Sequence, residues 1–367
     1  MRRLAAGPVN SFFYLFEWGL TEISNIGYIS SLQELCDIHS LLFNSLSTSN
    51  ESGILTNQIT SPDVIDSLPV TAQAVSSPRT NVVSGISIET PKMSLNQMTT
   101  YHWSLLDEVT QYQSAGIEAI GLWRPKLTDF GEEKAVELIR ESGLSVSNVS
   151  WAGGFTGTNE YSIDESLEDA RDAIRLSAEL NAECLMIASG SRSGHTVNHA
   201  RRLVVSALQE LGEFAGEYGV TLAVQPMRKM FARDWTFLNT LDQALDLLDS
   251  IGLQNVKLGF DVYHLWQESN IVGRIAEFAD SIATVQLSDW HVPTRSEQDR
   301  CLPGDGIIPL AAIVQSLLEN GYQGSFDVLI WSEELWKTDH EQLMRDCQSR
   351  FHSLFASSKL GGRQLSG

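Results

Sequence analysis

Residues 239–266 read NTLDQALDLLDSIGLQNVKLGFDVYHLW, and this stretch decides the fold because it holds a helix and a strand joined by a short loop. A capping box of Thr240 with Gln243 opens the helix and Gly252 ends it. The β-rich run 256–261 follows within a few residues. We expect the buried stripe of this helix to be Leu241, Ala244, Leu245, Leu248 and Ile251.

The same alternation extends from this unit in both directions. Strands joined through helices pair in parallel, and eight of them favour a closed barrel over a doubly wound sheet, which usually has about five or six. The loops after strands five and seven, residues 226–238 and 288–308, are long, whereas those after helices are short. We therefore predict a single-domain (β/α)8 TIM barrel whose site lies on the loops after the strands. The expected strands are residues 86–89, 118–122, 145–149, 183–188, 220–225, 256–261, 282–287 and 326–330.

The chain has a different character before the first of these strands. Residues 45–80 are rich in Ser, Thr, Asn and Pro and follow neither period. Such a segment buries too little apolar surface to offset the entropy lost on ordering. We predict a weakly ordered N-terminal extension over residues 1–83, the barrel over residues 84–356 and a flexible tail over residues 357–367.

Charge and cysteine usage exclude several classes of protein. The 46 acidic and 25 basic residues give a formal net charge of −21, which repels phosphate backbones and anionic membrane surfaces. The four cysteines have no short spacings, so neither a disulfide framework nor a zinc cluster is indicated. No apolar run approaches the ~20 residues of a membrane-spanning helix, and Glu17 interrupts the apolar run near Arg2 and Arg3. We expect no nucleic-acid partner, no membrane partner and a cytoplasmic location.

Short phrases follow the predicted strands in a definite order. They are DVYHLW at residues 261–266, QLSDW at 286–290, PTR at 293–295, PGDG at 303–306 and SEELW at 332–336. Together they resemble the xylose isomerase-like barrel family of sugar phosphate isomerases and epimerases, over about residues 85–351. The resemblance implies a barrel that acts on a small sugar-like molecule.

The resemblance also implies a metal site. Members of the family bind one divalent cation through side chains that end strands five to eight, usually Glu, Asp, His or Gln, and Glu. The cation stabilises an enediolate, and the two glutamates exchange protons with opposite sides of the sugar. The matching positions here are Gln225, Asp261, Gln286 and Leu329. The implied ligands are Asp261, Gln286 and Gln225, holding Mg, Mn, Co or Zn weakly, because an amide cannot titrate and Leu can neither titrate nor bind a cation.

Other residues are candidates for the proton transfer that the missing glutamates would perform. Strand alternation places Asp327 on the same face as Leu329, roughly 6–7 Å deeper in the barrel. His264 follows Asp261 by three residues, where relatives place a histidine that faces the substrate. We therefore take His264, Asp261 and Asp327 as candidate catalytic residues, the alternative being packed or hydrogen-bonded structural side chains.

A second set of residues lies on loops where relatives contact their substrates. Each of them has an ordinary alternative as a packing, surface or loop-anchoring side chain. Trp151 is a further aromatic residue that could stack on a sugar face. The candidate substrate-binding residues are Trp123, Lys126, Asp289, His291 and Arg300.

Two functional hypotheses follow. The first is a sugar, sugar phosphate or cyclitol isomerase or epimerase that works by metal-assisted proton transfer through an enediolate. The second is a catalytically impaired or repurposed barrel that binds a carbohydrate-like ligand without turnover, which the replacements at Gln225 and Leu329 favour. Both predict a small-molecule ligand and no organic cofactor, and both are compatible with a homo-oligomer.

Overall fold

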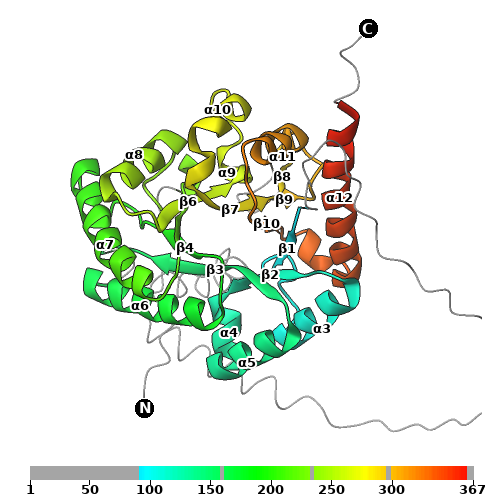
Figure 1. Cartoon of the computed structure of the whole chain (residues 1–367), viewed down its shortest axis with the longest axis horizontal. Helices are drawn as coiled ribbons and strands as arrows, with labels where there is room; N and C mark the ends of the chain where they lie inside the picture. The colour runs from blue at the N-terminus through cyan, green and yellow to red at the C-terminus, as the bar shows by residue number, and fades with distance from the viewer. Residues whose placement is uncertain (1–90, 158–160, 232–234, 295–298, 362–367) are drawn as a thin grey trace, which may run out of the picture. The chain divides into compact units, whose positions relative to one another are not determined.

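Eight parallel strands close into a barrel inside a ring of helices (Figure 1). The structure is a computed structural model that describes residues 91–157, 161–231, 235–294 and 299–361, with side chains described as far as residue 355. Around the barrel the strands follow the order β1-β10-β7-β6-β5-β4-β3-β2. Their bounds are β1 Met93–Asn96, β2 Ala119–Trp123, β3 Ser145–Gly153, β4 Leu185–Ala188, β5 Leu222–Val224, β6 Val256–Asp261, β7 Ile282–Leu287 and β10 Phe326–Val328.

The remaining two strands form a separate antiparallel pair in the long excursion between β7 and the next helix. Strand β8 spans Asp289–Trp290 and β9 spans Arg300–Cys301, with Trp290 opposite Arg300. This pair lies outside the barrel sheet. The predicted long loop after strand seven therefore contains structure of its own.

Helices fill the crossovers between the barrel strands. Their first turns follow the sequence closely: Ser104 and Ser162 each form a capping box with an acidic residue three positions on. Short 3-10 turns occur at Lys229–Phe231, Ala279–Ser281 and Leu335–Lys337. The helices are α3 Leu105–Ala115, α4 Arg124–Phe130, α5 Glu132–Ser142, α6 Ile163–Glu179, α7 Val197–Glu217, α8 Leu241–Ile251, α9 Val262–Leu265, α10 Ile271–Phe278, α11 Leu310–Glu319 and α12 His340–Gly361.

Helix α8 shows how well local patterns specify an element and where they mislead. Thr240 caps the backbone N–H of Gln243 as predicted, and Gly252 ends the helix in the left-handed region at φ 72°. The Gln243 side chain, however, accepts from the N–H of Asn239 at 2.8 Å. Leu247, which the predicted stripe omits, is fully buried, whereas Leu245 and Leu248 of the stripe are only partly buried. The predicted stripe was therefore slightly rotated, because a helical period alone does not fix which flank faces the sheet.

The barrel begins later than the sequence pattern suggested. The predicted first strand at residues 86–89 lies outside the described residues, as does the predicted extension at residues 1–83. The strand that closes the barrel between β10 and β2 is Met93–Asn96. Its four residues are polar at alternate positions, with Ser94 and Asn96 facing the barrel carboxylate described below. At the other end, helix α12 continues to Gly361, inside the segment predicted as a flexible tail.

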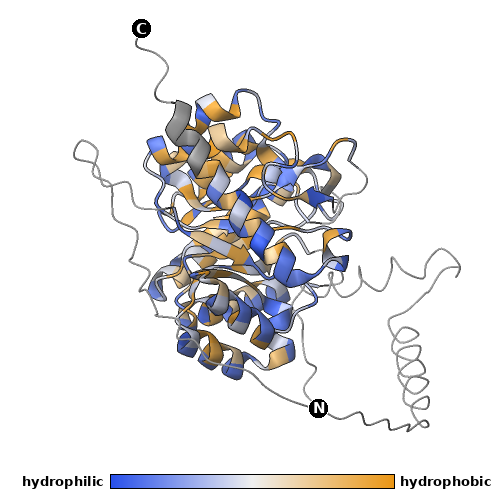
Figure 2. Cartoon of the chain, turned by 90° about the vertical axis from the view of Figure 1, so that its right-hand side faces the viewer, coloured by the Kyte–Doolittle hydropathy of each residue, from blue (hydrophilic) through white to orange (hydrophobic). Residues whose placement is uncertain are grey.

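The main hydrophobic core lies between the sheet and the outer helices, which carry both hydrophobic and hydrophilic residues (Figure 2). A second, smaller cluster fills the upper interior of the barrel and includes Met98, Trp123, Trp151, Met186 and Leu329. Among the described residues, no helix combines the length and apolar character needed to cross a membrane.

A polar and very tightly packed layer of side chains also lies inside the barrel. Strand register places Asp261, Gln286 and Asp327 side by side across β6, β7 and β10. Gly121 on β2 lies so close to this layer that an added Cβ would be 2.5 Å from Asn96 Nδ2 and 2.6 Å from Asp327 Oδ1. The glycine is therefore a requirement of close packing.

Gly121→Ala should destabilise the protein by about 1–3 kcal/mol, because the new methyl group must displace hydrogen-bonded side chains in a closed barrel. Gly216→Ala is the matched control, since a Cβ there would meet its nearest atom, Asn255 Nδ2, at 3.6 Å, an ordinary contact. The control, within helix α7, should be neutral or stabilising by up to about 1 kcal/mol. Denaturant unfolding of both variants measures the difference, and equal stabilities would contradict the packing argument.

Candidate active site

The four positions that the family resemblance singled out lie together at the carboxyl ends of neighbouring strands. Asp261 ends β6 and Gln286 is the second-last residue of β7. Gln225 and Leu329 directly follow β5 and β10, and their backbone N–H groups donate to the carbonyls of Ile187 and Leu287. All four side chains are buried. The sequence thus places them correctly at the mouth of the barrel.

The two glutamines link the polar groups of this layer. Gln225 donates from Nε2 to Asp261 Oδ2 and to Gln286 Oε1, each at 3.1 Å. Its own carbonyl oxygen accepts from Trp151 Nε1 at 3.1 Å. Gln286 Nε2 in turn points to Asp327 Oδ2 at 3.4 Å. Both amides therefore direct their NH2 groups toward carboxylates, and both amide oxygens already accept hydrogen bonds from the protein.

Arg300, carried by β9, reaches into this layer and neutralises Asp261. Its two terminal nitrogens lie 3.2 and 2.8 Å from the two oxygens of Asp261, a bidentate pair. Nη1 also donates to Ser288 Oγ at 3.2 Å, and the guanidinium lies 4.4 Å above the ring of Tyr263. Burial raises the pKa of Asp261, but the charge and hydrogen bonds of Arg300, with smaller contributions from His264 and the Tyr263 N–H, hold it below its usual value. Asp261 is therefore an ionised, charge-paired carboxylate.

His264 lies on the pocket side of this ion pair. Its Nε2 is 3.3 Å from Arg300 Nη2 and 3.5 Å from Asp261 Oδ2. Burial, which Asp261 opposes and the nearby arginines reinforce, lowers the pKa of His264 to about 3. The imidazole is consequently neutral at physiological pH and accepts a hydrogen bond from the guanidinium at Nε2.

A pocket opens above these residues. Three tryptophans form much of its wall, and the rings of Trp151 and Trp235 are 5.9 Å apart. Large aromatic faces beside a few polar groups are typical of sites for small ring-shaped ligands. The described lining residues are Trp151, Gln225, Met227, Trp235, His264, Arg300, Leu329 and Trp331.

The donor set does not fit a divalent cation. The carboxylate of Asp261 is paired with Arg300, and the amide oxygens of Gln225 and Gln286 are turned to protein donors. The fourth position is the hydrocarbon side chain of Leu329, packed in the interior cluster. Within the described part of the chain, no three His, Cys, Asp or Glu side chains gather in a metal-binding group. Hard cations need several oxygen ligands, and here each of the three oxygen-bearing side chains is already held by donors of the protein.

Asp327 lies below the pocket and is held by a complete set of donors. It accepts from Asn96 at 2.7 Å, Asn148 at 2.8 Å and Ser94 at 3.0 Å, in addition to Gln286. Burial raises its pKa, and these hydrogen bonds partly oppose the rise. It is not among the described lining residues, and its predicted role in proton transfer stays a prediction.

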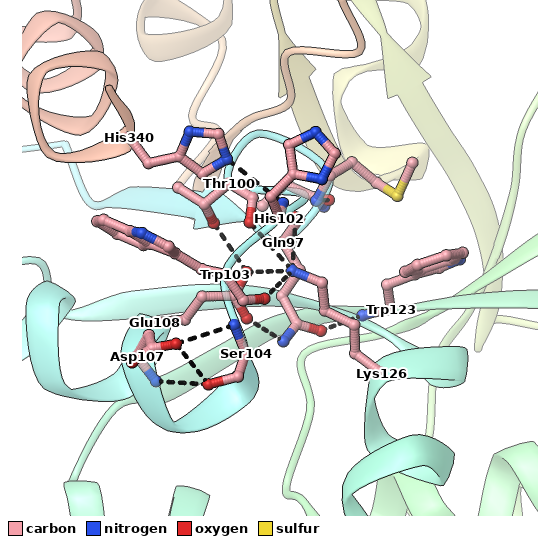
Figure 3. A network of polar contacts seen from close by, with 12 residues as sticks. Gln97, Thr100, His102, Trp103, Ser104, Asp107, Glu108, Trp123, Lys126 and His340 are labelled. Carbon is pink, nitrogen blue, oxygen red and sulfur yellow. Dashed lines mark hydrogen bonds and ion pairs between the residues drawn. The ribbon is translucent and has the colours of Figure 1, made fainter. Parts of the chain in front are cut away.

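The structure places Lys126 in a different network, at the start of α4. Figure 3 shows its ammonium pointing to Glu108, at 2.6 Å, and to the turn that follows β1. The same nitrogen donates to the carbonyls of Thr100 and Trp103 at 3.1 and 2.9 Å. Glu108 also accepts from Gln97 and Thr100. The lysine thus holds a turn and a buried carboxylate together.

Three other candidate residues also lie away from the pocket lining. Asp289 organises the excursion after β7, since its oxygens accept from the backbone N–H groups of Trp290, Gly304 and Ile308. Trp123 packs in the interior cluster of the barrel mouth, and His291 is a partly buried residue of the same excursion. Their predicted contact with substrate stays a prediction.

Sequence reasoning missed several residues of the site. Trp331 lies two positions after Leu329, so strand alternation could have found it. Ser288 directly follows β7 and was open to the same argument. Met227 and Trp235 belong to the irregular loop after β5, where no period indicates which side chains turn inward.

The chain matches the family described as Xylose isomerase-like TIM barrel over residues 109–348, and it belongs to that family. A crystal structure of a protein from Sinorhizobium meliloti 1021 superposes with a TM-score of 0.68 and 30% identity, covering 72% of this chain and 98% of that protein. A structure titled as IOLI protein with a binding zinc atom has a TM-score of 0.64 and 18% identity, covering 73% and 99%. At that identity the likeness concerns the fold.

Two curated relatives are enzymes of sugar and cyclitol chemistry by name. D-psicose 3-epimerase of Enterocloster bolteae is 28% identical over 163 residues, 40% of this chain and 50% of the epimerase. Inosose isomerase of Halalkalibacterium halodurans is 28% identical over 149 residues, 40% of this chain and 51% of the isomerase. The chain therefore spans about half the length of these curated relatives.

Lys126→Met should cost about 3–5 kcal/mol of stability above neutral pH, where Glu108 would be buried as a carboxylate without its cation. The cost should be smaller near neutral pH, because burial already raises the pKa of Glu108 to about 7 and the uncompensated group takes up a proton. The double variant Lys126→Met with Glu108→Gln removes the buried charge and should regain much of the loss. Chemical denaturation of the two single variants and the double variant measures this coupling. Additive effects would show that the two residues do not act as a pair.

The same network predicts a pH dependence. Burial raises the pKa of Glu108 from 4.5 to about 7, although Lys126 opposes the rise. Between pH 4.5 and about 7, Glu108 keeps a proton in the folded chain that it releases in the unfolded chain. Glu108 therefore contributes stability that is present below pH 4.5 and is lost as the pH rises through about 7. The stability of the wild type relative to the Lys126→Met, Glu108→Gln variant should fall across this range. A constant difference would contradict the assignment.

Proposed function

We propose that the chain is an isomerase whose substrate is a small sugar or cyclitol with a carbonyl group beside a hydroxyl-bearing carbon. Membership of the family supports this proposal, as do the named activities of the two curated relatives. The observation that carries it is the pocket at the strand ends, where His264 and the Arg300 guanidinium lie beside three tryptophan side chains. The tryptophan faces would stack on the ring of the ligand, and the two polar groups would face its oxygens.

The described lining residues favour isomerisation over epimerisation. Inversion at carbon by direct proton transfer needs titratable groups on opposite sides of the substrate, and Gln225 and Leu329 cannot titrate. Moving a carbonyl to the neighbouring carbon needs only one such group. In this proposal a ligand oxygen replaces His264 Nε2 as the acceptor of the Arg300 hydrogen bond. Nε2 then takes the proton from one carbon and returns it to the next on the same face, while the hydroxyl proton passes to the former carbonyl oxygen.

The low basicity of His264 implies slow turnover. Efficient bases have pKa values near the working pH, and burial keeps the pKa of this imidazole at about 3. During the reaction the developing enediolate would stand next to the fixed charge of Arg300, which stabilises it. The rate is therefore expected to depend on this charge more than on the strength of the base.

A second function, ligand binding without turnover, is favoured by one specific observation. No carboxylate is among the described residues that line the pocket. Asp261, which lies behind the lining residues Gln225 and Arg300, has both of its oxygens paired with Arg300. A barrel with this arrangement would still recognise a polyhydroxylated ring through its aromatic wall.

Incubation in deuterium oxide with a panel of ketoses, aldoses and inososes, followed by NMR, should reveal deuterium entering at the carbon beside the carbonyl. His264→Asn should reduce the exchange by roughly 10²–10⁴-fold, the usual contribution of a general base. His352→Asn, at an exposed histidine of helix α12, is the matched control and should leave it unchanged.

Binding of a panel member without exchange in the wild type would establish the second function instead of the first. Exchange that persists in His264→Asn would contradict the role of this residue. If no member of the panel either binds or exchanges, both functions are wrong for this class of ligand.

A further inference from the structure

The charge balance at Asp261 differs from that of a metal site. Both oxygens of this fully buried carboxylate lie within 3.2 Å of the guanidinium of Arg300. A bidentate guanidinium covers the two oxygens that a cation would use. Two positive charges cannot share one buried carboxylate without a large repulsive cost, since Coulomb interactions are strong at low dielectric.

The neighbouring amides are arranged to suit a guanidinium and a carboxylate. Gln225 presents its NH2 group to Asp261 and to Gln286, and it presents its oxygen to Trp151. A cation at this place would meet N–H donors, which repel it. A glutamate at position 225 would instead have faced Asp261 with a second negative charge. The glutamine and the arginine therefore form one consistent arrangement.

Arg300 is also fixed in position. Besides Asp261, its terminal nitrogens contact Ser288 and His264, and its planar face lies 4.4 Å from the centre of the Tyr263 ring. The residue is buried, and it is among the described residues that line the pocket. A charge held in this way acts on a ligand without having to reorganise.

We propose that Arg300 supplies the fixed positive charge of this site in place of a divalent cation, and that the barrel is metal-independent. The guanidinium pairs with Asp261 on one side and directs its field into the pocket on the other. The site then attracts oxygen atoms that carry or develop negative charge. This inference goes beyond the proposed isomerase activity and does not depend on turnover, because it concerns the resting site.

Manganese binding to the full chain tests the proposal in the absence of any substrate. Titration of Mn²⁺ into the wild type, followed by electron paramagnetic resonance, should show no binding at this site. Elemental analysis of the purified protein should find no stoichiometric metal, and a chelator should leave its melting temperature unchanged. Either a stoichiometric metal or a melting temperature that responds to Mn²⁺ and chelator would overturn the proposal.

A set of variants tests whether Arg300 competes with Mn²⁺ for Asp261 or only repels it through its positive charge. Gln225→Glu with Leu329→Glu supplies two carboxylates and should create measurable Mn²⁺ binding. Adding Arg300→Met should strengthen that binding at least tenfold, because the guanidinium no longer occupies Asp261. Adding Arg228→Met instead removes a positive charge that lies over Trp290 and makes no contact with Asp261 among the interactions of the described chain, so it should change binding much less.

If Arg300→Met and Arg228→Met strengthen Mn²⁺ binding equally, the proposal is wrong, since the loss of one positive charge near the site would then explain both results. Circular dichroism checks that each variant is folded. If Arg300→Met fails to fold, Arg300→Lys serves as the second variant: it keeps the charge but loses the bidentate contact. The lysine variant should bind Mn²⁺ no more than a few-fold better than its parent, and a gain as large as tenfold would contradict a charge-based role.

Discussion

A closed barrel excludes water from its interior, so each carboxylate inside it must be compensated by the protein. Asp261 and Asp327 are the register partners of Gln286 on the two strands that flank it. Asp261 is compensated by a full charge from Arg300, whereas Asp327 is surrounded only by dipoles, from Asn96, Asn148 and their neighbours. This difference agrees with the opposite pKa shifts of the two groups. The polar side chains of the barrel mouth are arranged so that Asp261 has a paired charge and Asp327 has hydrogen-bond donors.

The compensation of these carboxylates also determines the chemistry that the site offers. Because the amide NH2 groups turn to the carboxylates, the amide oxygens face other donors and are withdrawn from a ligand or cation. What remains toward the pocket is a neutral imidazole, the edge of a fixed guanidinium and a wall of tryptophan. Membership of the xylose isomerase-like family therefore describes the scaffold and its strand-end geometry. The electrostatics of this particular site are set by Gln225, Leu329 and Arg300.

The fold was largely predictable from sequence because the β and α periods alternate regularly, and strands β6 and β7 have the predicted bounds. The first strand was not, since Met93–Asn96 is short and half polar and resembles a loop. At the site, Asp261, Gln225, Gln286 and Leu329 were found through the family resemblance, which assigns them to the ends of strands. The partnership of Arg300 with Asp261 was not, because it arises from an excursion whose path no period predicts. Lys126 was expected near substrate, and its burial against Glu108, a helix residue 18 positions earlier, becomes visible only in three dimensions.

The arginine that balances the barrel arrives from the β8–β9 ribbon, outside the eight-stranded sheet. Strand residues are constrained by register and by neighbours on both sides, whereas a ribbon in a connecting segment can change length and sequence with little effect on the scaffold. One evolutionary change in this ribbon, without any change in a barrel strand, could therefore withdraw the counter-charge and alter the preference of the cavity from anionic toward cationic guests. Barrels of this kind could then diversify through changes in the β8–β9 ribbon, which carries the charged residue, while the eight-stranded sheet stays the same.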